Sequence, residues 1–256
     1  MSRPMASSES ASELRNCFPE GGVCDTAHGR LFTCEVRLRD IYRGGVKLTK
    51  SYLSAFRTAA SLETDELGRH LQALAEADPE TTALIDTETC GFHGRPLFLV
   101  GMVQYRSGRL ALSQYFARDY AEEAALLARL GELVPEVRLL VSFNGKAFDW
   151  PFVRDRMAYH RLPCPQLNAH VDLLHPSRRR WRAVLPDCKL QTLERYLSGR
   201  WRSGDIAGAE IPQRYHDFVR RQDARLIAPI FHHNRMDLIT MIELLVALVS
   251  RPAETT

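Results

Sequence analysis

The pattern of apolar and polar residues along the chain predicts a layered domain over its last two thirds. Short apolar runs rich in β-branched residues and bounded by turn residues predict strands, whereas apolar residues spaced three and four apart predict helices. The predicted strands cover 81–88, 97–105, 109–117, 138–143 and 169–174. The predicted helices cover 121–131, 150–160, 189–197, 211–221 and a last stretch that ends near residue 250. Three strands joined by short turns and followed by alternating helices and strands indicate an α/β fold, with a mixed sheet flanked by helices.

The residues before this domain have a different pattern. Residues 1–16 are rich in Ser, Ala and charge, which predicts a disordered tail. Two strand-like segments, 28–40 and 44–49, predict a small β-hairpin around a Gly-Gly turn. Leucines at helical spacing predict a helix over 64–77. We therefore expect three parts: a tail (1–16), an N-terminal hairpin and helix extension (17–80) and one main domain (81–250).

The composition predicts a cytoplasmic protein without a membrane partner. Hydrophobic residues make up 45% of the chain, enough for a sizeable core. The six cysteines form no C-x-x-C pair, which argues against a zinc site and favours reduced thiols. The N-terminal residues lack the apolar stretch of a signal peptide, and no apolar stretch reaches the roughly 18 residues of a membrane span.

The net charge is only +3, but the basic residues are unevenly distributed. The segment 176–225 holds 12 Lys and Arg against 6 Asp and Glu, an excess that suits a polyanionic substrate or the solvated face of Arg-rich helices. Its most basic stretch combines cations with one aromatic ring, which suits phosphate contacts and base stacking: Arg178, Arg179, Arg180 and Trp181. Packing in the core explains Trp181 equally well. Asn144 and Lys146 are further candidates for contacts with a nucleic-acid strand, although Asn-Gly is also an ordinary turn signal.

Acidic residues at the end of one predicted strand indicate a metal site. Asp86 and Glu88 end the 81–88 strand, and alternation along a strand turns both side chains to one face, with Cα atoms about 6–7 Å apart. Two carboxylates on one face of a buried strand repel each other and are poorly solvated, and a divalent cation removes both problems. Asp149 follows the 138–143 strand, where it can face this pair or cap the next helix.

A fourth carboxylate, Asp237, lies in the last predicted helix beside two histidines. His233 precedes Asp237 by four residues and shares its helix face, as a surface pair or as part of the acidic site. His232, one residue earlier, shares that face only where the chain is not yet helical. Asp172 and His175 are weaker candidates, because a buried Asp at a strand end is more often a structural hydrogen-bond partner.

The sequence blocks around these residues resemble a known family. DTET, NGKAFDWP and HNRMD resemble the three exonuclease motifs of DEDD nucleases, the proofreading-exonuclease branch of the ribonuclease-H-like fold. DLLHPSRRRW, CKLQTLERYL and DIAGAEIPQRYHDF resemble the YprB-type ribonuclease-H-like domain. The resemblance covers about residues 81–250.

The resemblance implies a site and a reaction. It implies that Asp86, Glu88, Asp149 and Asp237 bind metal. It also implies that His233 or His232 acts as the base: His233 matches the placement of Tyr in one branch of the family, His232 the usual placement of His, and helix geometry favours His233. Oxygen ligands suit two Mg²⁺ or Mn²⁺ ions, which can activate water and stabilise the leaving oxygen in phosphodiester hydrolysis.

We therefore expect a metal-dependent nuclease that hydrolyses DNA or RNA. The resemblance implies that it is a 3′-to-5′ exonuclease acting on a single-stranded end. Two alternatives share the fold: a structure-selective endonuclease that uses the same metals, and a nucleic-acid-binding module without turnover. The four carboxylates favour an enzyme, because a binding module has no need for a costly acidic cluster.

Overall fold

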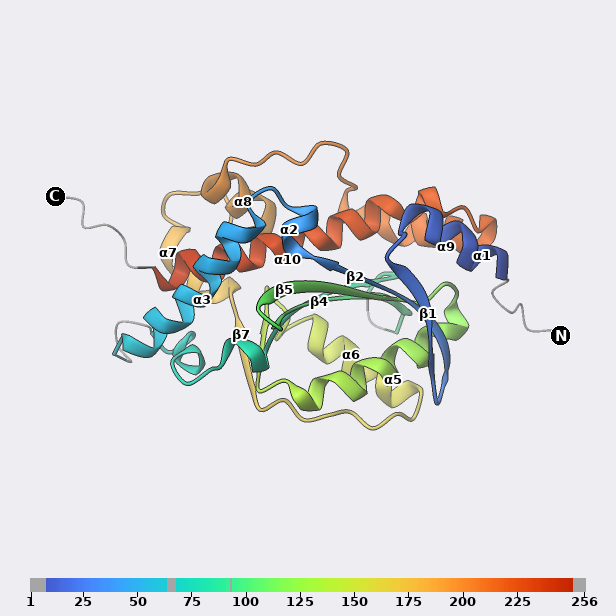
Figure 1. Ribbon diagram of the computed structural model, residues 1–256, viewed down its shortest axis with the longest axis horizontal. Helices are drawn as coiled ribbons and strands as arrows, with labels where there is room; N and C mark the ends of the chain where they lie inside the picture. Colours follow the sequence, from blue (N-terminus) through green and yellow to red (C-terminus); the bar gives the residue numbers. More distant parts are fainter. Residues whose placement is uncertain (1–7, 64–67, 93, 251–256) are drawn as a thin grey trace.

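The computed structural model describes residues 8–63, 68–92 and 94–250, and it shows one seven-stranded sheet between layers of helices (Figure 1). The strand order is β1-β2-β5-β4-β3-β6-β7. The strands are β1 (Gly21–Thr26), β2 (Gly29–Arg37), β3 (Thr82–Thr89), β4 (Leu97–Arg106), β5 (Arg109–Phe116), β6 (Leu139–Ser142) and β7 (Ala169–Asp172). The pairs β3–β6 and β6–β7 are parallel and the other pairs are antiparallel, so the fold is α/β with a mixed sheet.

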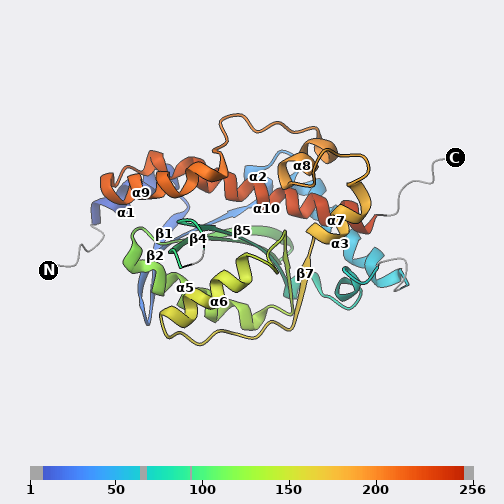
Figure 2. The same ribbon diagram turned by 180° about the vertical axis from the view of Figure 1, so that it is seen from behind.

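Helices cover both faces of the sheet. On one face lie α5 (Glu123–Leu133) and α6 (Asp149–Tyr159) (Figure 1). On the other face the long helix α10 (Ala228–Val249) runs across β3 and β4, and α3 (Gly45–Ser61) and α8 (Leu190–Ser198) pack against it (Figure 2). The remaining helices are α1 (Ser8–Cys17), α2 (Leu38–Ile41), α7 (Leu174–Trp181) and α9 (Ile211–Arg221). Short 3₁₀ turns lie at Gln72–Leu74, Pro79–Thr81, Tyr120–Glu122, Val134–Glu136, Gly208–Glu210 and Ala224–Leu226.

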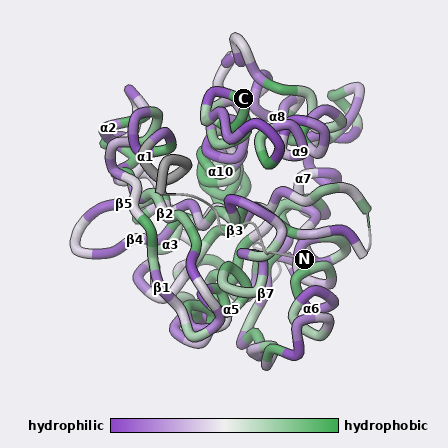
Figure 3. Tube along the Cα trace, turned by 90° about the vertical axis from the view of Figure 1, so that its right-hand side faces the viewer, coloured by the Kyte–Doolittle hydropathy of each residue, from purple (hydrophilic) through white to green (hydrophobic). Residues whose placement is uncertain are grey.

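Buried aromatic side chains fix α9 and α10 on the sheet. Phe98 of β4 stacks on Tyr215 of α9 with ring centroids 3.9 Å apart, and Phe116 of β5 meets Phe231 of α10 at 5.2 Å. All four side chains are fully buried. Burial of each such side chain contributes about 1.5–3 kcal/mol to the free energy of unfolding. The hydrophobic colouring of α10 in Figure 3 agrees with its position inside the molecule. These contacts hold the N-terminal half of α10 at a fixed height above β3 and β4.

The predicted elements of the main domain are present, with boundaries that differ by at most two residues, and the predicted α/β fold with a mixed sheet is confirmed. Helix α7, however, has no counterpart among the predicted elements. Its eight residues include Pro176 and three consecutive arginines and carry too few apolar positions to give a periodic signal.

The N-terminal extension differs more from its prediction. The hairpin consists of β1 and β2, and its strand β2 pairs with β5, so the hairpin continues the main sheet. The segment 44–49, predicted as a strand, instead begins α3, where a Cβ on Gly45 would lie 2.6 Å from the carbonyl oxygen of Leu38. Residues 8–16, predicted to be disordered, belong to α1, whose Leu14 is fully buried, and residues 1–7 lie outside the described chain.

The helix predicted over 64–77 is also wrong where it can be compared. Residues 64–67 lie outside the described chain, and 68–77 contain only the 3₁₀ turn Gln72–Leu74. Leu71 and Leu74 are buried, so the apolar spacing reflects burial without a regular helix. In the described part of the chain, no helix is long and apolar enough to cross a membrane.

Candidate active site

The acidic pair at the end of β3 faces α10. Asn234 of α10 donates through Nδ2 to Oδ2 of Asp86 at 2.8 Å, which places the Asp86 side chain on the α10 face of the sheet. Glu88 shares that face because it lies two residues further along the strand. Within the described residues, the Glu88 carboxylate has no hydrogen-bond or ion-pair partner, and it lines a cavity.

A glycine in β4 brings α10 close to Asp86. Gly101 is the register partner of Asp86, and a Cβ on Gly101 would lie 2.1 Å from Oδ1 of Asn234. Gln114 in turn donates through Nε2 to the same Oδ1 at 2.9 Å, and Arg235 donates to the Gln114 oxygen at 2.7 Å. These bonds fix the orientation of the Asn234 amide, so that its NH₂ group faces Asp86.

Asp149 reaches the site from the first residue of α6. Thr87, which alternates with Asp86 and Glu88 along β3, donates from Oγ1 to Oδ1 of Asp149 at 2.5 Å. The N-cap position of α6 is held by Phe148, and Asp149 is the first helical residue, so Asp149 is not the N-cap. The turn before it is held by Asp172, whose carboxylate accepts from the backbone N–H groups of Asn144 at 2.8 Å and Lys146 at 3.1 Å. Asp172 thus has the structural role that its position at a strand end suggested.

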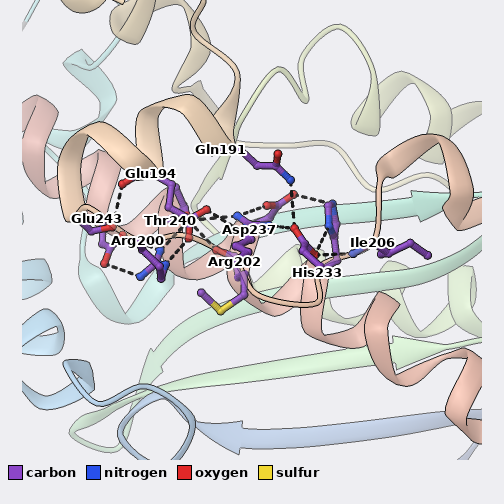
Figure 4. Close-up of polar contacts among 12 residues, drawn as sticks. Gln191, Glu194, Arg200, Arg202, Ile206, His233, Asp237, Thr240 and Glu243 are labelled. Carbon is purple, nitrogen blue, oxygen red and sulfur yellow. Dashed lines mark hydrogen bonds and ion pairs between the residues drawn. The ribbon is translucent and has the colours of Figure 1, made fainter.

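Asp237 completes the set from α10, one turn after His233. Its Oδ1 lies 2.6 Å from Nη2 of Arg202, and its Oδ2 lies 3.4 Å from Nε2 of His233 (Figure 4). His233 is buried and contacts both Asp205 and Asp237, whereas His232 is exposed. Of the two histidines considered from the sequence, His233 is therefore the one beside the carboxylates.

Burial raises the pKa of all four carboxyl groups, and nearby carboxylates add to the increase. Burial is the largest cause for each of them, and it raises the pKa of Asp149 to about 6. For Asp86 the next causes are the nearby charges of Asp237 and Asp149, and for Glu88 they are Asp86 and Asp237. The pKa of Asp237 is raised despite the opposing charges of His233 and Arg202. In each of the four groups the charged form is disfavoured, as expected for carboxylates in a poorly solvated region beside other negative charges.

The donor set fits divalent cations that prefer oxygen ligands, Mg²⁺ or Mn²⁺. The side chains are, however, engaged with protein partners: Asp86 with Asn234, Asp149 with Thr87 and Asp237 with Arg202. Among the described residues, no three or more His, Cys, Asp or Glu side chains are placed so that they could hold a metal ion together. A metal ion held by these carboxylates would therefore require side-chain rearrangement.

A cavity of about 590 Å³ opens beside Glu88 and Asp149. Two aromatic residues line it and remain accessible to solvent, Phe92 (87% exposed) and Phe148 (54% exposed). The remaining lining is mostly apolar: Gly91, Phe152, Gly208, Ala209, Ile211 and Pro212, with Thr87 and Thr89. The apolar and aromatic walls of this cavity suit a ligand with a flat ring. The carboxylates at its end would lie beside a polar group of that ligand.

Some of the residues predicted to contact nucleic acid are exposed to solvent, and others are bonded to or packed against the rest of the protein. Arg178, Arg179 and Lys146 are exposed. Arg180 donates to the carbonyl oxygen of Ala247 and so holds α7 against the C-terminal end of α10. Trp181 is 5% exposed and packs in the core, so the packing interpretation applies and its ring is not accessible to a base in this structure.

Three residues of the site were not predicted from the sequence as site residues: Asn234, Arg202 and Asp205. Asn234 stands inside the HNRMD block, directly after His233, but its side chain was given no role there. Arg202 and Asp205 lie in an irregular loop between α8 and the turn Gly208–Glu210, where no periodicity signals their side-chain direction. Only the fold shows that this loop lies over α10.

Comparison with known proteins agrees with this architecture. Residues 83–249 match the family model described as the RNase_H superfamily, so the chain belongs to the ribonuclease H superfamily. It carries a YprB-type ribonuclease-H-like domain: it is 35% identical over 164 residues to the uncharacterized protein YprB of Bacillus subtilis (strain 168), a match that covers 62% of this chain. That match spans 40% of YprB, less than half of its length.

Among solved structures, the chain is similar to the family B DNA polymerase from the hyperthermophilic archaeon Pyrobaculum calidifontis. The TM-score is 0.51 at 17% sequence identity, and the match covers 65% of this chain and 24% of the polymerase. At this identity the similarity shows a common fold.

Proposed function

We propose that this protein is a metal-dependent nuclease that hydrolyses phosphodiester bonds of DNA or RNA, removing nucleotides from a 3′ end. One observation carries the proposal: Asp86, Glu88, Asp149 and Asp237 come from three separate elements to one partly buried region, and each has a raised pKa. Such a cluster destabilises a protein unless a bound cation offsets the repulsion. Membership of the ribonuclease H superfamily and a fold shared with a DNA polymerase support a nucleic-acid substrate.

The four carboxylates would hold two Mg²⁺ or Mn²⁺ ions, which when bound supply a nucleophilic water and stabilise charge on the leaving oxygen. The protein's own groups have complementary tasks. His233 presents Nε2 toward Asp237, where it can accept the proton of the attacking water. Asn234 holds one oxygen of Asp86, which leaves the other oxygen for metal.

The cavity beside Glu88 offers a place for the terminal nucleotide. Its open aromatic rings, Phe92 and Phe148, can stack on a base, and stacking contributes about 1–3 kcal/mol per base without sequence preference. Exposed cations at Lys146, Arg178 and Arg179 would contact the phosphates of the strand. The 3′-to-5′ direction rests on the resemblance of the three motifs to DEDD exonucleases.

Hydrolysis of a 5′-labelled single strand tests the proposal. We expect DNA or RNA 20-mers to yield a ladder with Mg²⁺ or Mn²⁺ and none with EDTA. Asp86→Asn should abolish the ladder, whereas Asp40→Asn, at an exposed site on α2, should leave it unchanged. Full activity of the Asp86→Asn protein would contradict the proposed site.

A circular single strand distinguishes the two enzyme alternatives, because only an endonuclease cuts a substrate without ends. Retained binding of a labelled strand without any metal-dependent cleavage would identify a nucleic-acid-binding module instead.

A further inference from the structure

Asp205 uses both of its carboxylate oxygens inside the protein. Oδ1 accepts from Nδ1 of His233 at 2.9 Å and from the backbone N–H of Ile206 at 3.1 Å. Oδ2 accepts from Nε2 of Gln191 at 3.1 Å and from Nη1 of Arg202 at 3.3 Å. The side chain is 10% exposed, so these four donors take the place of water. Three of the four serve to fix the carboxylate, and the fourth is the ring of His233.

The two ring nitrogens of His233 have unequal carboxylate neighbours: Nδ1 lies at hydrogen-bonding distance from Asp205, 2.9 Å, whereas Nε2 lies 3.4 Å from Asp237. An ionised carboxylate can only accept hydrogen bonds, so Nδ1 of His233 must be the donor toward Asp205. In the neutral ring, Nε2 is then the nitrogen with the free lone pair. Nε2 lies on the side of the ring that faces Asp237, 3.4 Å from its Oδ2 (Figure 4).

We propose that Asp205 is a positioning residue for the reaction: it fixes the ring plane and the Nδ1-protonated form of His233, so that Nε2 is presented to the substrate water. This inference rests on the proposed function, because it assigns the role of the base to His233. It adds a residue from the loop after α8, outside the four carboxylates, to the working site. Loss of such a supporting hydrogen bond lowers activity by about 10–100-fold in comparable sites.

Asn is an informative replacement because neither orientation of its amide satisfies the site. With its oxygen toward His233, its NH₂ group would face the donors of Gln191 and Arg202. With its NH₂ group toward His233, the ring would have to accept at Nδ1 and carry its proton on Nε2. Asp205→Asn thus alters the hydrogen bonding of His233 with almost no change in volume.

A double-mutant cycle in kinetics separates positioning from general structural support. We expect Asp205→Asn to lower kcat about 10–100-fold with KM changed less than about threefold. In a His233→Ala background the same substitution should change kcat by less than about twofold, because the ring that it positions is gone. Glu243→Gln is the matched control: this carboxylate lies on α10 and accepts from Tyr42 and Arg200 without contacting His233, so kcat should stay unchanged. Equal losses from Asp205→Asn in both backgrounds would overturn the inference.

A measurement independent of turnover keeps the two proposals distinguishable. Two-bond ¹H–¹⁵N spectra of histidine-labelled protein, recorded in EDTA at a pH where the ring is neutral, report its tautomer, and the His233→Ala spectrum assigns the signal. We expect the Nδ1-protonated form in the wild type and the Nε2-protonated form in Asp205→Asn. The expected spectra without any hydrolysis by the wild type would sustain the positioning and refute the proposed function. An Nε2-protonated His233 in the wild type would refute the positioning, whatever the activity.

Discussion

Nη2 of Arg202 lies 2.6 Å from Oδ1 of Asp237, so a cation from the protein neutralises one of the four candidate metal ligands. The same guanidinium donates through Nε to Glu194 at 2.6 Å, and its side chain is 5% exposed. Burial alone would lower the pKa of Arg202, but the charges of Asp237 and Glu194 outweigh it and raise that pKa, so the guanidinium stays charged. Arg202 therefore acts as an internal counterion for the acidic site.

Removal of this counterion should destabilise the metal-free protein. Arg202→Met leaves the buried carboxylates of Asp237 and Glu194 without one of their partners, and breaking a buried pair in this way costs about 3–5 kcal/mol. We expect a lower Tm in EDTA, by thermal unfolding followed by circular dichroism. Added Mg²⁺ should restore part of the loss in Arg202→Met, because it substitutes for the missing charge. An unchanged Tm in EDTA would show that the Arg202 contacts contribute nothing to stability.

The raised pKa of Asp149, about 6, predicts an unusual pH dependence. The unfolded value is about 3.9, so between these values the folded state binds the proton more readily, and protonation stabilises it. The ionised carboxylate therefore destabilises the fold above pH ~6, and this effect disappears as the pH falls toward ~4. Asp149→Asn should be more stable than the wild type at pH 7.5 in EDTA, by roughly 1–3 kcal/mol, because Thr87 can still donate to the amide oxygen.

The check is the difference in urea-unfolding free energy between the two proteins at pH 7.5, 6 and 4.5. That difference should shrink steadily as the pH falls. A constant difference, or a less stable Asp149→Asn at pH 7.5, would contradict the predicted sign.

Divalent metal should raise the Tm of the wild type above that of variants that lack one of the candidate metal ligands. A ligand that binds only the folded state stabilises it by about 2.7 kcal/mol at 100 times its Kd. Mg²⁺ or Mn²⁺ should therefore raise the Tm of the wild type at pH 7.5 and have little effect on Asp86→Asn or Asp237→Asn. The control is an EDTA buffer of the same ionic strength without divalent cations, because salt alone also screens the repulsion between the carboxylates. Equal shifts in all three proteins would indicate screening in place of a site.

The exposed rings of the cavity should affect substrate binding more than stability. Phe92→Ala and Phe148→Ala remove the two accessible aromatic walls, and we expect a KM higher by about 5- to 150-fold from about 1–3 kcal/mol of lost stacking. Tm should change by less than 2 °C or so, because these side chains bury little surface. Val46→Ala, an exposed apolar residue of α3, is the control. Wild-type KM values in both variants would exclude the cavity as the substrate site.

The sequence predicted those features that depend on local periodicity. Asp86 and Glu88 end one apolar strand, and Asp149 follows its parallel neighbour β6, so strand alternation and parallel pairing place these residues at the same edge of the sheet. The segment 44–49 was predicted as the second strand of a hairpin at a Gly-Gly turn, whereas it begins α3, and the packing of α3 on α10 overrides that local signal. Arg202 and Asp205 lie in a loop whose side-chain directions depend on α8 and α10, and no local signal encodes them.

The approach of α10 to the sheet gives the last prediction, at Gly101. This residue stands opposite Asp86 in β4, and an added Cβ would overlap the Asn234 amide at 2.1 Å and Leu238 Cδ1 at 2.7 Å. Because Phe231 and Leu238 are fully buried, α10 cannot move away without losing core contacts, so overpacking by Gly101→Ala should cost about 1–3 kcal/mol. The displaced Asn234 would also release the Asp86 carboxylate, so a higher metal concentration should be needed for the Tm shift described above. Gly131→Ala on α5, where the nearest atoms to an added Cβ lie 3.9 Å away, is the matched control and should retain the wild-type metal response. A Gly101→Ala protein with wild-type stability and metal response would show that α10 is not held against β4 as closely as these contacts require.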